Sequence, residues 1–313
     1  MSVREINFAS YNGRDTIQGW IYTPILKPRA IVQIVHGLNE HSRRYTHMIY
    51  RMLDAGFVVC ADDHAAHGKT AADSDTWGDS GDKGWLTAIE DEHTLRKITE
   101  DAFPGLPFVI FGHSWGSMIT RAYTALHGSG VKAAIYCGAV ARQKGMEPRY
   151  QKLKAAIEAG KGGEPGIELT DTESASIAYR YENPADPNAW LAVDPAVGAD
   201  YASDPFNNLN HPLTNQFLYD FTELYRFTES EDWAAKVPID LPVYLIAGDQ
   251  DPVGNFGEGV YHTANALWDT GHRFVKTQVY SGFRHEIHNE PAIRNEVADG
   301  VIAFIDKALE SCS

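Results

Sequence analysis

Ser114 is the residue whose neighbours point most directly to chemistry. It lies between Gly112 and Gly116 in VIFGHSWGSMITRAY (109–123), where an apolar run ends and a helix-like pattern begins. A Gly-x-Ser-x-Gly motif between a strand and a helix is typical of a strained turn that lifts a serine hydroxyl above a sheet. Only residues without a side chain fit the crowded positions two before and two after that serine. The motif therefore predicts a nucleophilic serine.

Two pairs of downstream residues offer the partners that such a serine needs. A serine hydroxyl is a weak nucleophile near neutral pH, so a histidine must take its proton while an acid holds the histidine. On a parallel sheet these partners follow later strands, in the order serine, acid, histidine. The run LPVYLIAG is followed by Asp249 and Asp251, and the run FVKTQVYSG is followed by His285 and His288. The pattern alone does not choose within either pair.

Hydrogen-bond donors for the developing oxyanion are expected from two places. The backbone N–H of Trp115, directly after the nucleophile, can supply one donor. The loop His36-Gly37-Leu38, which follows an earlier apolar run, is placed to supply the other. Because these donors are backbone groups, the side chain at 115 is free to shape the pocket, and the tryptophan would narrow the pocket if its ring faces the substrate.

Short apolar runs alternate with helical patterns along most of the chain. An initial segment, 4–23, has alternating apolar residues around an Asn-Gly turn, which is typical of a hairpin. The later strand-like runs cover 29–37, 57–64, 107–114, 131–140, 241–251 and 274–282. Strands that alternate with helices predict an α/β fold with a mostly parallel central sheet and helices on both faces.

The alternation breaks between about 142 and 237, where Pro, Gly and Asp clusters separate aromatic-rich pieces. We therefore expect a core formed by residues 1–141 and 238–313, with 142–237 inserted as a helical cap. Phe217, Phe221 and Leu224 in this insertion fall on one face of a helix. Such a face packs against the core, and it can line an apolar pocket as well.

Composition limits the partners and the compartment of the protein. The 313 residues carry a formal net charge of -15 and no dense Lys/Arg cluster, so we expect no nucleic-acid partner. A signal-peptide pattern is lacking, and the longest apolar stretches are too short to span a bilayer. Cys60 and Cys137 lie within apolar runs, so no disulfide framework is evident. We expect a cytoplasmic protein without integral membrane association.

Several segments resemble the α/β-hydrolases of the monoacylglycerol lipase and lysophospholipase-like branch, which also contains proteins labelled serine aminopeptidases. HGLNEHSRRY (36–45) is similar to HGxGEHxxRY, DHAAHG (63–68) to DHRGHG, and FPGLPFVIFGHSWGS (103–117) to PGLPxxxxGHSMGG. LPVYLIAGDQDPVG (241–254) and YSGFRHEIHNE (280–290) resemble its acid and histidine segments, and WLAVDPAVGADYASDPF (190–206) resembles a cap segment of bacterial members. The similarity runs over nearly the whole chain.

By position, the resemblance implies that Ser114 is the nucleophile, Asp251 the acid and His285 the base. It also implies an oxyanion hole formed by the backbone N–H groups of Leu38 and Trp115. The implied activity is hydrolysis of small apolar acyl esters, such as monoacylglycerols or lysophospholipids, through an acyl-enzyme. No cofactor is implied, and the expected partner is a small-molecule ester.

The chain departs from the pattern of this branch at a few positions. Asn39 stands where glycine is usual, and Ala65 and Ala66 replace Arg-Gly in the second motif. Trp115 and Ser117 replace Met and Gly after the nucleophile. None of these changes removes a residue of the implied catalytic triad, but positions 39 and 115 lie near the expected pocket and bear on acyl-chain specificity.

Two alternative activities use the same catalytic residues. A serine aminopeptidase or amidase is the first, because a Ser-Trp-Gly elbow also occurs in proline iminopeptidases of this fold. It would need carboxylates that hold the amino group of a substrate, and the acidic cap residues are Glu173, Asp220, Glu223, Glu229 and Glu231. The second is acyl transfer to an acceptor other than water.

Two histidine pairs, His64 with His67 and His285 with His288, raise the question of a metal-dependent hydrolase. The segment HEIH lacks the HExxH spacing in which two helix-borne ligands share a face. We therefore expect no metal.

Overall fold

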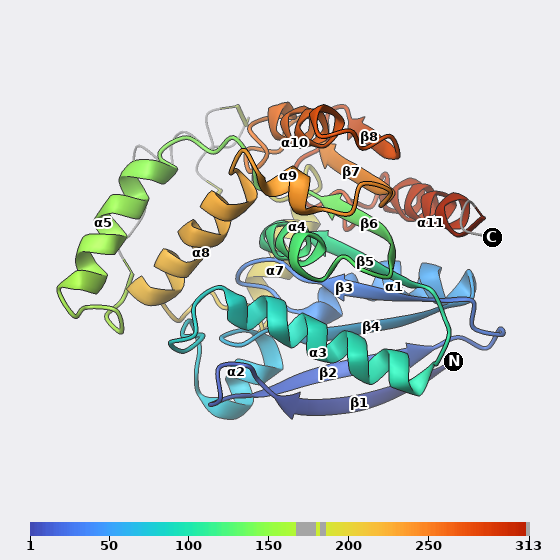
Figure 1. Ribbon diagram of the computed structural model, residues 1–313. Coiled ribbons are helices and arrows are strands. Elements are labelled where there is room, and N and C mark those ends of the chain that lie inside the picture. Colours follow the sequence, from blue (N-terminus) through green and yellow to red (C-terminus); the bar gives the residue numbers. More distant parts are fainter. Residues whose placement is uncertain (167–179, 182–185, 311–313) are drawn as a thin grey trace.

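A central sheet with helices on both faces forms the framework of the molecule (Figure 1). The computed structural model describes residues 1–166, 180–181 and 186–310. The sheet has eight strands in the order β1-β2-β4-β3-β5-β6-β7-β8. Their bounds are β1 Ser2–Ala9, β2 Thr16–Thr23, β3 Ala30–Val35, β4 Phe57–Asp63, β5 Phe108–His113, β6 Val131–Cys137, β7 Val243–Gly248 and β8 Val275–Tyr280.

Strand directions confirm the predicted hairpin and the mostly parallel sheet. β1 and β2 pair antiparallel, and β2 also runs antiparallel to β4. All the other pairings, from β4 through β3, β5, β6 and β7 to β8, are parallel. The carboxyl ends of six strands therefore meet at one edge of the sheet, which is where ligands bind in open α/β sheets.

Apolar side chains on the two faces of the sheet form two separate core layers. Along the central strands, neighbouring residues alternate between the layers: Val35 and Ile110 belong to one, and Ile34 and Phe111 to the other. Every residue of β3, β4 and β5 is buried. This is why these strands are continuous apolar runs in the sequence, since a strand covered on both faces has no solvent side.

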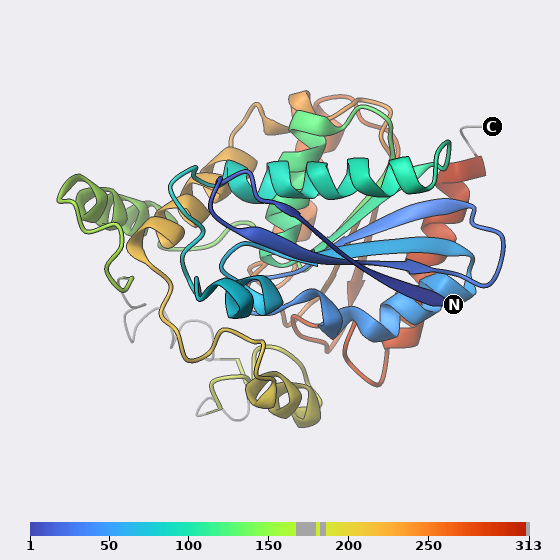
Figure 2. The ribbon, with the colours of Figure 1, turned by 90° about the horizontal axis from the view of Figure 1, so that it is seen from below.

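Helices cover each layer. One face carries α3 Leu86–Ala102, α4 Trp115–His127 and α10 Glu258–Asp269, and the other carries α1 Thr46–Asp54 and α11 Arg294–Glu310. Viewed from below, α3 in teal and α1 in light blue lie on opposite sides of the sheet (Figure 2). Two short elements, the 3-10 turn η1 Ser42–Tyr45 and α2 Gly68–Ser74, follow β3 and β4. The sequence prediction of a two-faced α/β fold is confirmed.

Helices and one isolated bridge are the regular elements among the described residues between β6 and β7. They are α5 Met146–Glu158, α7 Pro195–Ser203, α8 Asn215–Thr228 and α9 Trp233–Lys236. The bridge joins Pro165 and Thr214. α8 packs against both α4 and α5, and its Phe217 and Leu224 are buried in the core layer. Phe221 on the same helix is only partly buried, so α8 both packs on the core and reaches the space beyond the sheet.

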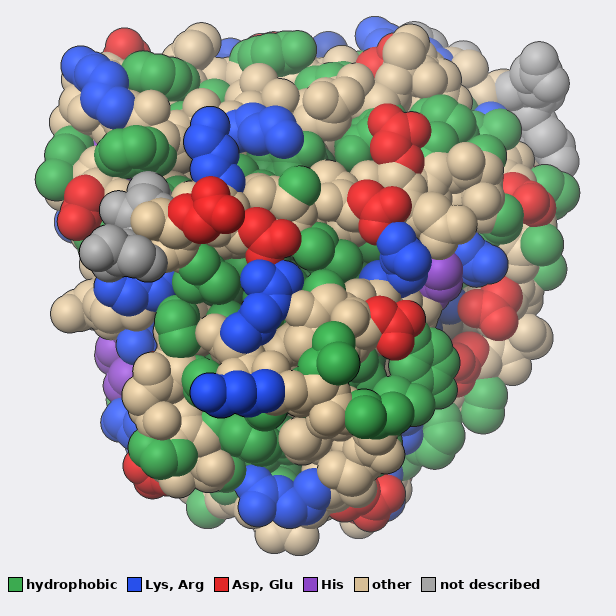
Figure 3. All heavy atoms as spheres, turned by 90° about the vertical axis from the view of Figure 1, so that its right-hand side faces the viewer, with side chains coloured by type: hydrophobic (Ala, Val, Ile, Leu, Met, Phe, Trp, Pro, Cys, Tyr) green, Lys and Arg blue, Asp and Glu red, His purple; other side chains and the backbone are tan. Residues whose placement is uncertain are grey.

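On the face shown in Figure 3, side chains of Lys and Arg lie interspersed with those of Asp and Glu. Within the described ranges, none of the helices combines the length and the apolar character needed to cross a membrane.

Candidate active site

The turn that carries Ser114 joins β5 directly to α4. Ser114 adopts φ 57° and ψ −122°, a backbone conformation that residues other than glycine rarely adopt. A Cβ atom on Gly112 would overlap the carbonyl group of Gly116, and a Cβ on Gly116 would overlap the carbonyl group of Val35. Both glycines are therefore required by close backbone contacts, in agreement with the expectation from the motif.

Asp251 and His285 meet beside this turn. His285 Nδ1 lies 2.9 Å from Asp251 Oδ2, and both side chains are buried. The second oxygen of Asp251 accepts the backbone N–H of Val253 at 2.9 Å, which fixes the carboxylate. His285 Nε2 is buried and has no hydrogen-bond partner among the described residues. The imidazole ring lies between the rings of His113 and Trp190, with centroid distances of 4.5 and 5.0 Å.

The competing residues of each pair have other contacts. Asp249 accepts hydrogen bonds from Ser281 Oγ at 2.8 Å and from the backbone N–H of Gly282 at 2.7 Å, so it braces the turn after β8. His288 is buried with its ring stacked on Tyr45, at a centroid distance of 4.7 Å. The contacts therefore favour the Asp251 and His285 pairing that the family resemblance implied, a choice that the pattern alone left open.

The surroundings of His285 favour its protonated form. Burial acts to lower the pKa of His285, but the charge and hydrogen bond of Asp251, together with the charges of Glu286 and Glu40, outweigh burial and raise the pKa above its ordinary value. An imidazole in this position is well suited to accept a proton, because the imidazolium that forms is stabilised by the neighbouring carboxylates.

Two backbone N–H groups near Ser114 are free to bind an oxyanion. Among the described residues, no hydrogen-bond acceptor is recorded for the N–H of Leu38 or of Trp115. The loop before Leu38 is held by Glu40, whose Oε1 accepts the N–H of Gly37 at 2.6 Å. These contacts agree with the two donors expected from the sequence.

Glu40 belongs to a buried network that the sequence interpretation missed. Tyr45 donates its hydroxyl to Glu40 at 2.6 Å, and Arg44 contacts Glu40 at 3.2 Å. The same Arg44 binds Glu286 at 2.6 Å and Asp200 of α7 at 3.1 Å. The available signal was the density of ionisable side chains in HGLNEHSRRY, a stretch that the fold buries beside the turn.

The histidine loop is attached to a segment that precedes α7. The N–H of His285 reaches the carbonyl of Trp190 at 3.4 Å, and the N–H of Glu286 reaches the carbonyl of Leu191 at 2.6 Å. Arg284 adds hydrogen bonds to the carbonyls of Ala189, at 2.6 Å, and of Ala192, at 2.9 Å. Residues 189–192 therefore support the loop from the side opposite the sheet.

Ser114 opens into a cavity of about 210 Å³. Its apolar wall comes from the loops after β3, β6 and β7 and from α5 and α8, through Leu38, Val140, Met146, Phe221 and Val253. Polar side chains, among them Asn39, Gln143 and Tyr201, line the remainder. Of these wall residues the sequence singled out Leu38, Asn39 and Phe221, because only the folded chain brings the others together.

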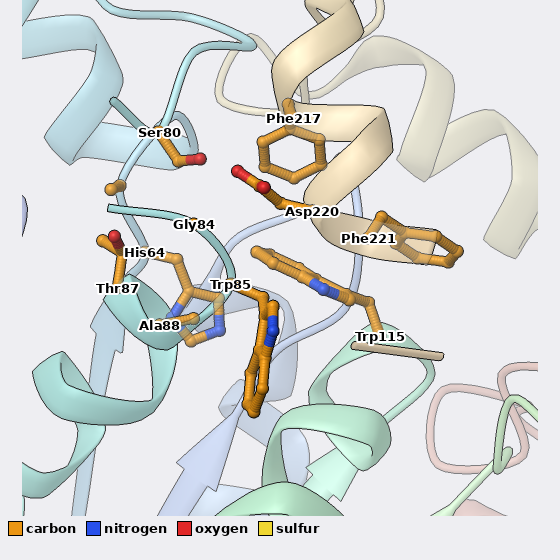
Figure 4. A pocket seen from close by; sticks show the side chains of 11 residues that line it. His64, Ser80, Gly84, Trp85, Thr87, Ala88, Trp115, Phe217, Asp220 and Phe221 are labelled. Atoms are coloured by element: carbon orange, nitrogen blue, oxygen red, sulfur yellow. The ribbon is translucent and has the colours of Figure 1, made fainter. Parts of the chain in front are cut away.

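The Trp115 side chain lines a second, smaller pocket instead of this cavity (Figure 4). Its indole lies between His67 and Phe217, with centroid distances of 5.1 and 5.3 Å. The Trp115 ring therefore does not face the cavity at Ser114, so it does not narrow that cavity.

Asp220 is the acidic residue of this second pocket, with Trp85, Trp115, Phe217 and Phe221 around it (Figure 4). It is 6% exposed, and its Oδ2 has no hydrogen-bond partner among the described residues. Burial raises the pKa of Asp220 to about 7.

The other acidic residues considered for an amino group do not line this pocket. Glu229 pairs with Arg121 at 3.0 Å, and Glu223 lies 3.9 Å from Arg226. Glu231 is not among the lining residues, and Glu173 lies outside the described residues. Asp220 is therefore the candidate that the structure retains.

Two of the departures from the family pattern occupy unusual backbone positions. Asn39 has φ 60° and Ala66 has φ 72°, and both stand where the motifs that the chain resembles have glycine. Asparagine adopts this left-handed region more readily than most residues, whereas alanine pays a steric cost for it. The glycine-like backbone is therefore kept although the glycines are absent.

The fold and the turn at Ser114 define an α/β-hydrolase, and comparisons with known proteins agree. A family model described as "Serine aminopeptidase, S33" matches residues 26–292. A monoacylglycerol lipase from Mycolicibacterium smegmatis is 28% identical over 305 residues, which cover 96% of each chain.

Two solved structures share the whole architecture. A highly thermostable carboxyl esterase from Bacillus coagulans, solved with glycerol, is 51% identical with a TM-score of 0.95, over 98% of this chain and 99% of that one. A lipase in an open form is 42% identical with a TM-score of 0.92, over 98% and 99% of the two chains. The protein belongs to the serine aminopeptidase S33 family, among the α/β-hydrolases of the esterase and lipase type.

The close contact at Gly116 gives a test of the turn. We expect Gly116→Ala to lower the free energy of unfolding by about 1–3 kcal/mol, because the new methyl group must displace the carbonyls of Val35 and His36. Urea denaturation measures this change. Gly163→Ala is the matched control, because a Cβ there meets no atom within 4 Å. Equal stability of the two variants would contradict the close contact.

Proposed function

We propose that the protein is a serine esterase that cleaves small apolar acyl esters, with Ser114 as nucleophile, His285 as base and Asp251 as the acid that orients the base. The observation that carries this proposal is the 2.9 Å Asp251 to His285 contact beside the strained turn of Ser114, with His285 Nε2 left unpartnered among the described residues. A buried imidazole nitrogen without a partner is the group that a nucleophile or a substrate would complete.

In the proposed mechanism, His285 Nε2 accepts the proton of the Ser114 hydroxyl as the oxygen attacks the ester carbonyl carbon. The N–H groups of Leu38 and Trp115 donate to the oxyanion of the tetrahedral intermediate. His285 then gives the proton to the departing alcohol, and the acyl group remains on Ser114. A water molecule, deprotonated by His285, attacks the acyl-enzyme and releases the carboxylic acid.

The substrate class follows from the cavity and from the named relatives. The apolar side chains in the wall favour an acyl chain, and the polar side chains favour an alcohol group that can hydrogen bond. The relatives are named as a monoacylglycerol lipase and a carboxyl esterase, which is consistent with an acyl ester of modest size. No step of this mechanism uses a metal or an organic cofactor.

We infer that residues 142–237 act as a cap on this cavity, with 1–141 and 238–313 as the catalytic core. Met146 on α5 and Phe221 on α8 belong to the cavity wall, so the insertion contributes directly to it. Figure 1 shows α5 and α8 beyond the edge of the sheet. The cap would set acyl-chain preference, because its side chains close the part of the cavity that the sheet leaves open.

The nucleophile is tested with p-nitrophenyl esters of increasing acyl length. We expect wild-type protein to release p-nitrophenol and Ser114→Ala to lose about 10⁴-fold or more in kcat, because the covalent step is removed. Ser129→Ala, at an exposed loop position, should keep full activity. Equal turnover by wild type and Ser114→Ala would remove Ser114 from the mechanism.

The role of His285 as general base predicts how kcat/KM depends on pH. A general base must be neutral, so kcat/KM should rise with pH through the pKa of His285 in the free enzyme. Because that pKa is raised, the midpoint should lie above the ordinary histidine value of about 6.5. Asp251→Asn should lower the midpoint and reduce kcat by about 10⁴-fold.

Asp249→Asn is the matched control, since it makes the same chemical change two residues away. It should leave the midpoint where it is in the wild type. A midpoint below the ordinary histidine value in the wild type, or an equal shift in both variants, would contradict the assignment.

An aminoacyl ester or amide is the second candidate substrate, and Asp220 is the observation that favours it. A carboxylate in a pocket of aromatic rings can hold an ammonium group through charge and cation–π attraction. We expect Asp220→Asn to raise KM for an aminoacyl p-nitrophenyl ester while leaving KM for the matched ester without the amine unchanged. Glu223→Gln serves as the control. If Asp220→Asn leaves KM unchanged for both esters, the aminoacyl substrate is rejected and the simple ester remains as the proposed substrate.

A further inference from the structure

A cluster of three ionisable side chains lies outside the cavity at Ser114. Asp62 and His64 come from the end of β4, and Glu92 comes from α3. Their exposed fractions are 0%, 1% and 0%. One ligand-type atom from each residue lies within 4.8 Å of the other two. None of the three is needed for the ester hydrolysis proposed above.

The tautomer of His64 makes its inner nitrogen an acceptor. His64 Nε2 lies 3.3 Å from the carbonyl oxygen of His36, an atom that can only accept, so Nε2 carries the proton. His64 Nδ1 therefore presents a lone pair toward the interior of the cluster. It lies 3.4 Å from Asp62 Oδ1 and 3.4 Å from Glu92 Oε1.

The facing oxygens are acceptors as well. Asp62 Oδ1 and Oδ2 and Glu92 Oε1 are buried, and the described residues bring no donor to them apart from a proton that the two carboxyls can share. Glu92 Oε2 is satisfied by the side-chain amide of Gln33. Three acceptor atoms therefore converge in a dry interior, and such an arrangement is strongly unfavourable unless a metal ion or a shared proton lies among them.

The spacing fits a tetrahedral divalent ion. Zinc bonds of about 2.0–2.1 Å to imidazole nitrogen and carboxylate oxygen place neighbouring ligand atoms about 3.3–3.4 Å apart. Both distances from His64 Nδ1 have this value. We propose that Asp62, His64 and Glu92 bind a Zn²⁺-type divalent ion that stabilises the fold, with an enclosed water as the fourth ligand.

The surrounding contacts are those expected around a metal ligand. A ligating histidine usually donates its other N–H to a carbonyl or a carboxylate, as His64 does to His36, and ligating carboxylates are themselves hydrogen-bonded, as Glu92 is to Gln33. Through His36 the ion would connect β4 and α3 to the loop that carries Leu38. Its role is therefore structural support of the oxyanion loop.

Metal content and stability of the whole chain test the proposal. Protein refolded with Zn²⁺ and then desalted should contain about one zinc per chain, and its Tm should exceed that of protein refolded with a chelator by about 5 °C or more. Asp62→Asn and Glu92→Gln should lose the bound zinc. Glu90→Gln is the matched control, because Glu90 lies on the same helix but pairs with His127 at 2.9 Å.

Anomalous X-ray scattering at the zinc edge keeps the proposal testable if those variants do not fold. A peak bonded to Asp62, His64 and Glu92 in wild-type crystals supports it, and a peak elsewhere overturns it. The proposal is also overturned if wild-type protein binds no zinc and its Tm is the same after refolding with Zn²⁺ and with a chelator. A proton shared by Asp62 and Glu92 would then supply the missing positive charge. Ester hydrolysis by the same samples reports on the proposed function independently.

Discussion

The close approach of backbone at Gly112, Ser114 and Gly116 is the constraint on which the rest of the site depends. Because Gly116 has no side chain, the first turn of α4 rests on the carbonyl groups of Val35 and His36 at the end of β3. Ser114, the proposed nucleophile, and the loop that carries Leu38 are thus neighbours through backbone contact. The remaining parts, from Asp251 to the helices between β6 and β7, are arranged around a turn whose position is already set.

Buried charge holds the loops that surround this turn. Arg44 contacts Glu40 beside the oxyanion loop, Glu286 beside the catalytic histidine candidate, and Asp200 on α7. These segments are far apart in sequence, and one guanidinium fixes their relative positions. Glu40 and Glu286 are buried with Arg44, whereas the Asp200 side chain is 76% exposed. Buried ion pairs add little net stability once desolvation is counted, but removing Arg44 would leave Glu40 and Glu286 unpaired in a low-dielectric interior. Their value here lies in geometry.

Much of the framework could be predicted from the sequence, and the failures have a common cause. Strand-like runs and the Asn-Gly hairpin follow from short-range patterns, and so does the turn at Ser114. The choice of Asp251 over Asp249, the orientation of the Trp115 ring and the partners of Arg44 depend on contacts between distant segments. Local periodicity carries no information about such contacts. The family resemblance supplied the first of them, whereas the second and third became visible only in three dimensions.

The attachment of the His285 loop to residues 189–192 restricts how the insertion can move. If the whole of 142–237 lifted away from the core as one body, the carbonyls of Trp190 and Leu191 would leave the backbone of His285 and Glu286 without partners. The proposed catalytic geometry at His285 therefore depends on residues 190 and 191 staying where they are. The segment 189–192 is thus tied to the core through the backbone that carries His285 and Glu286.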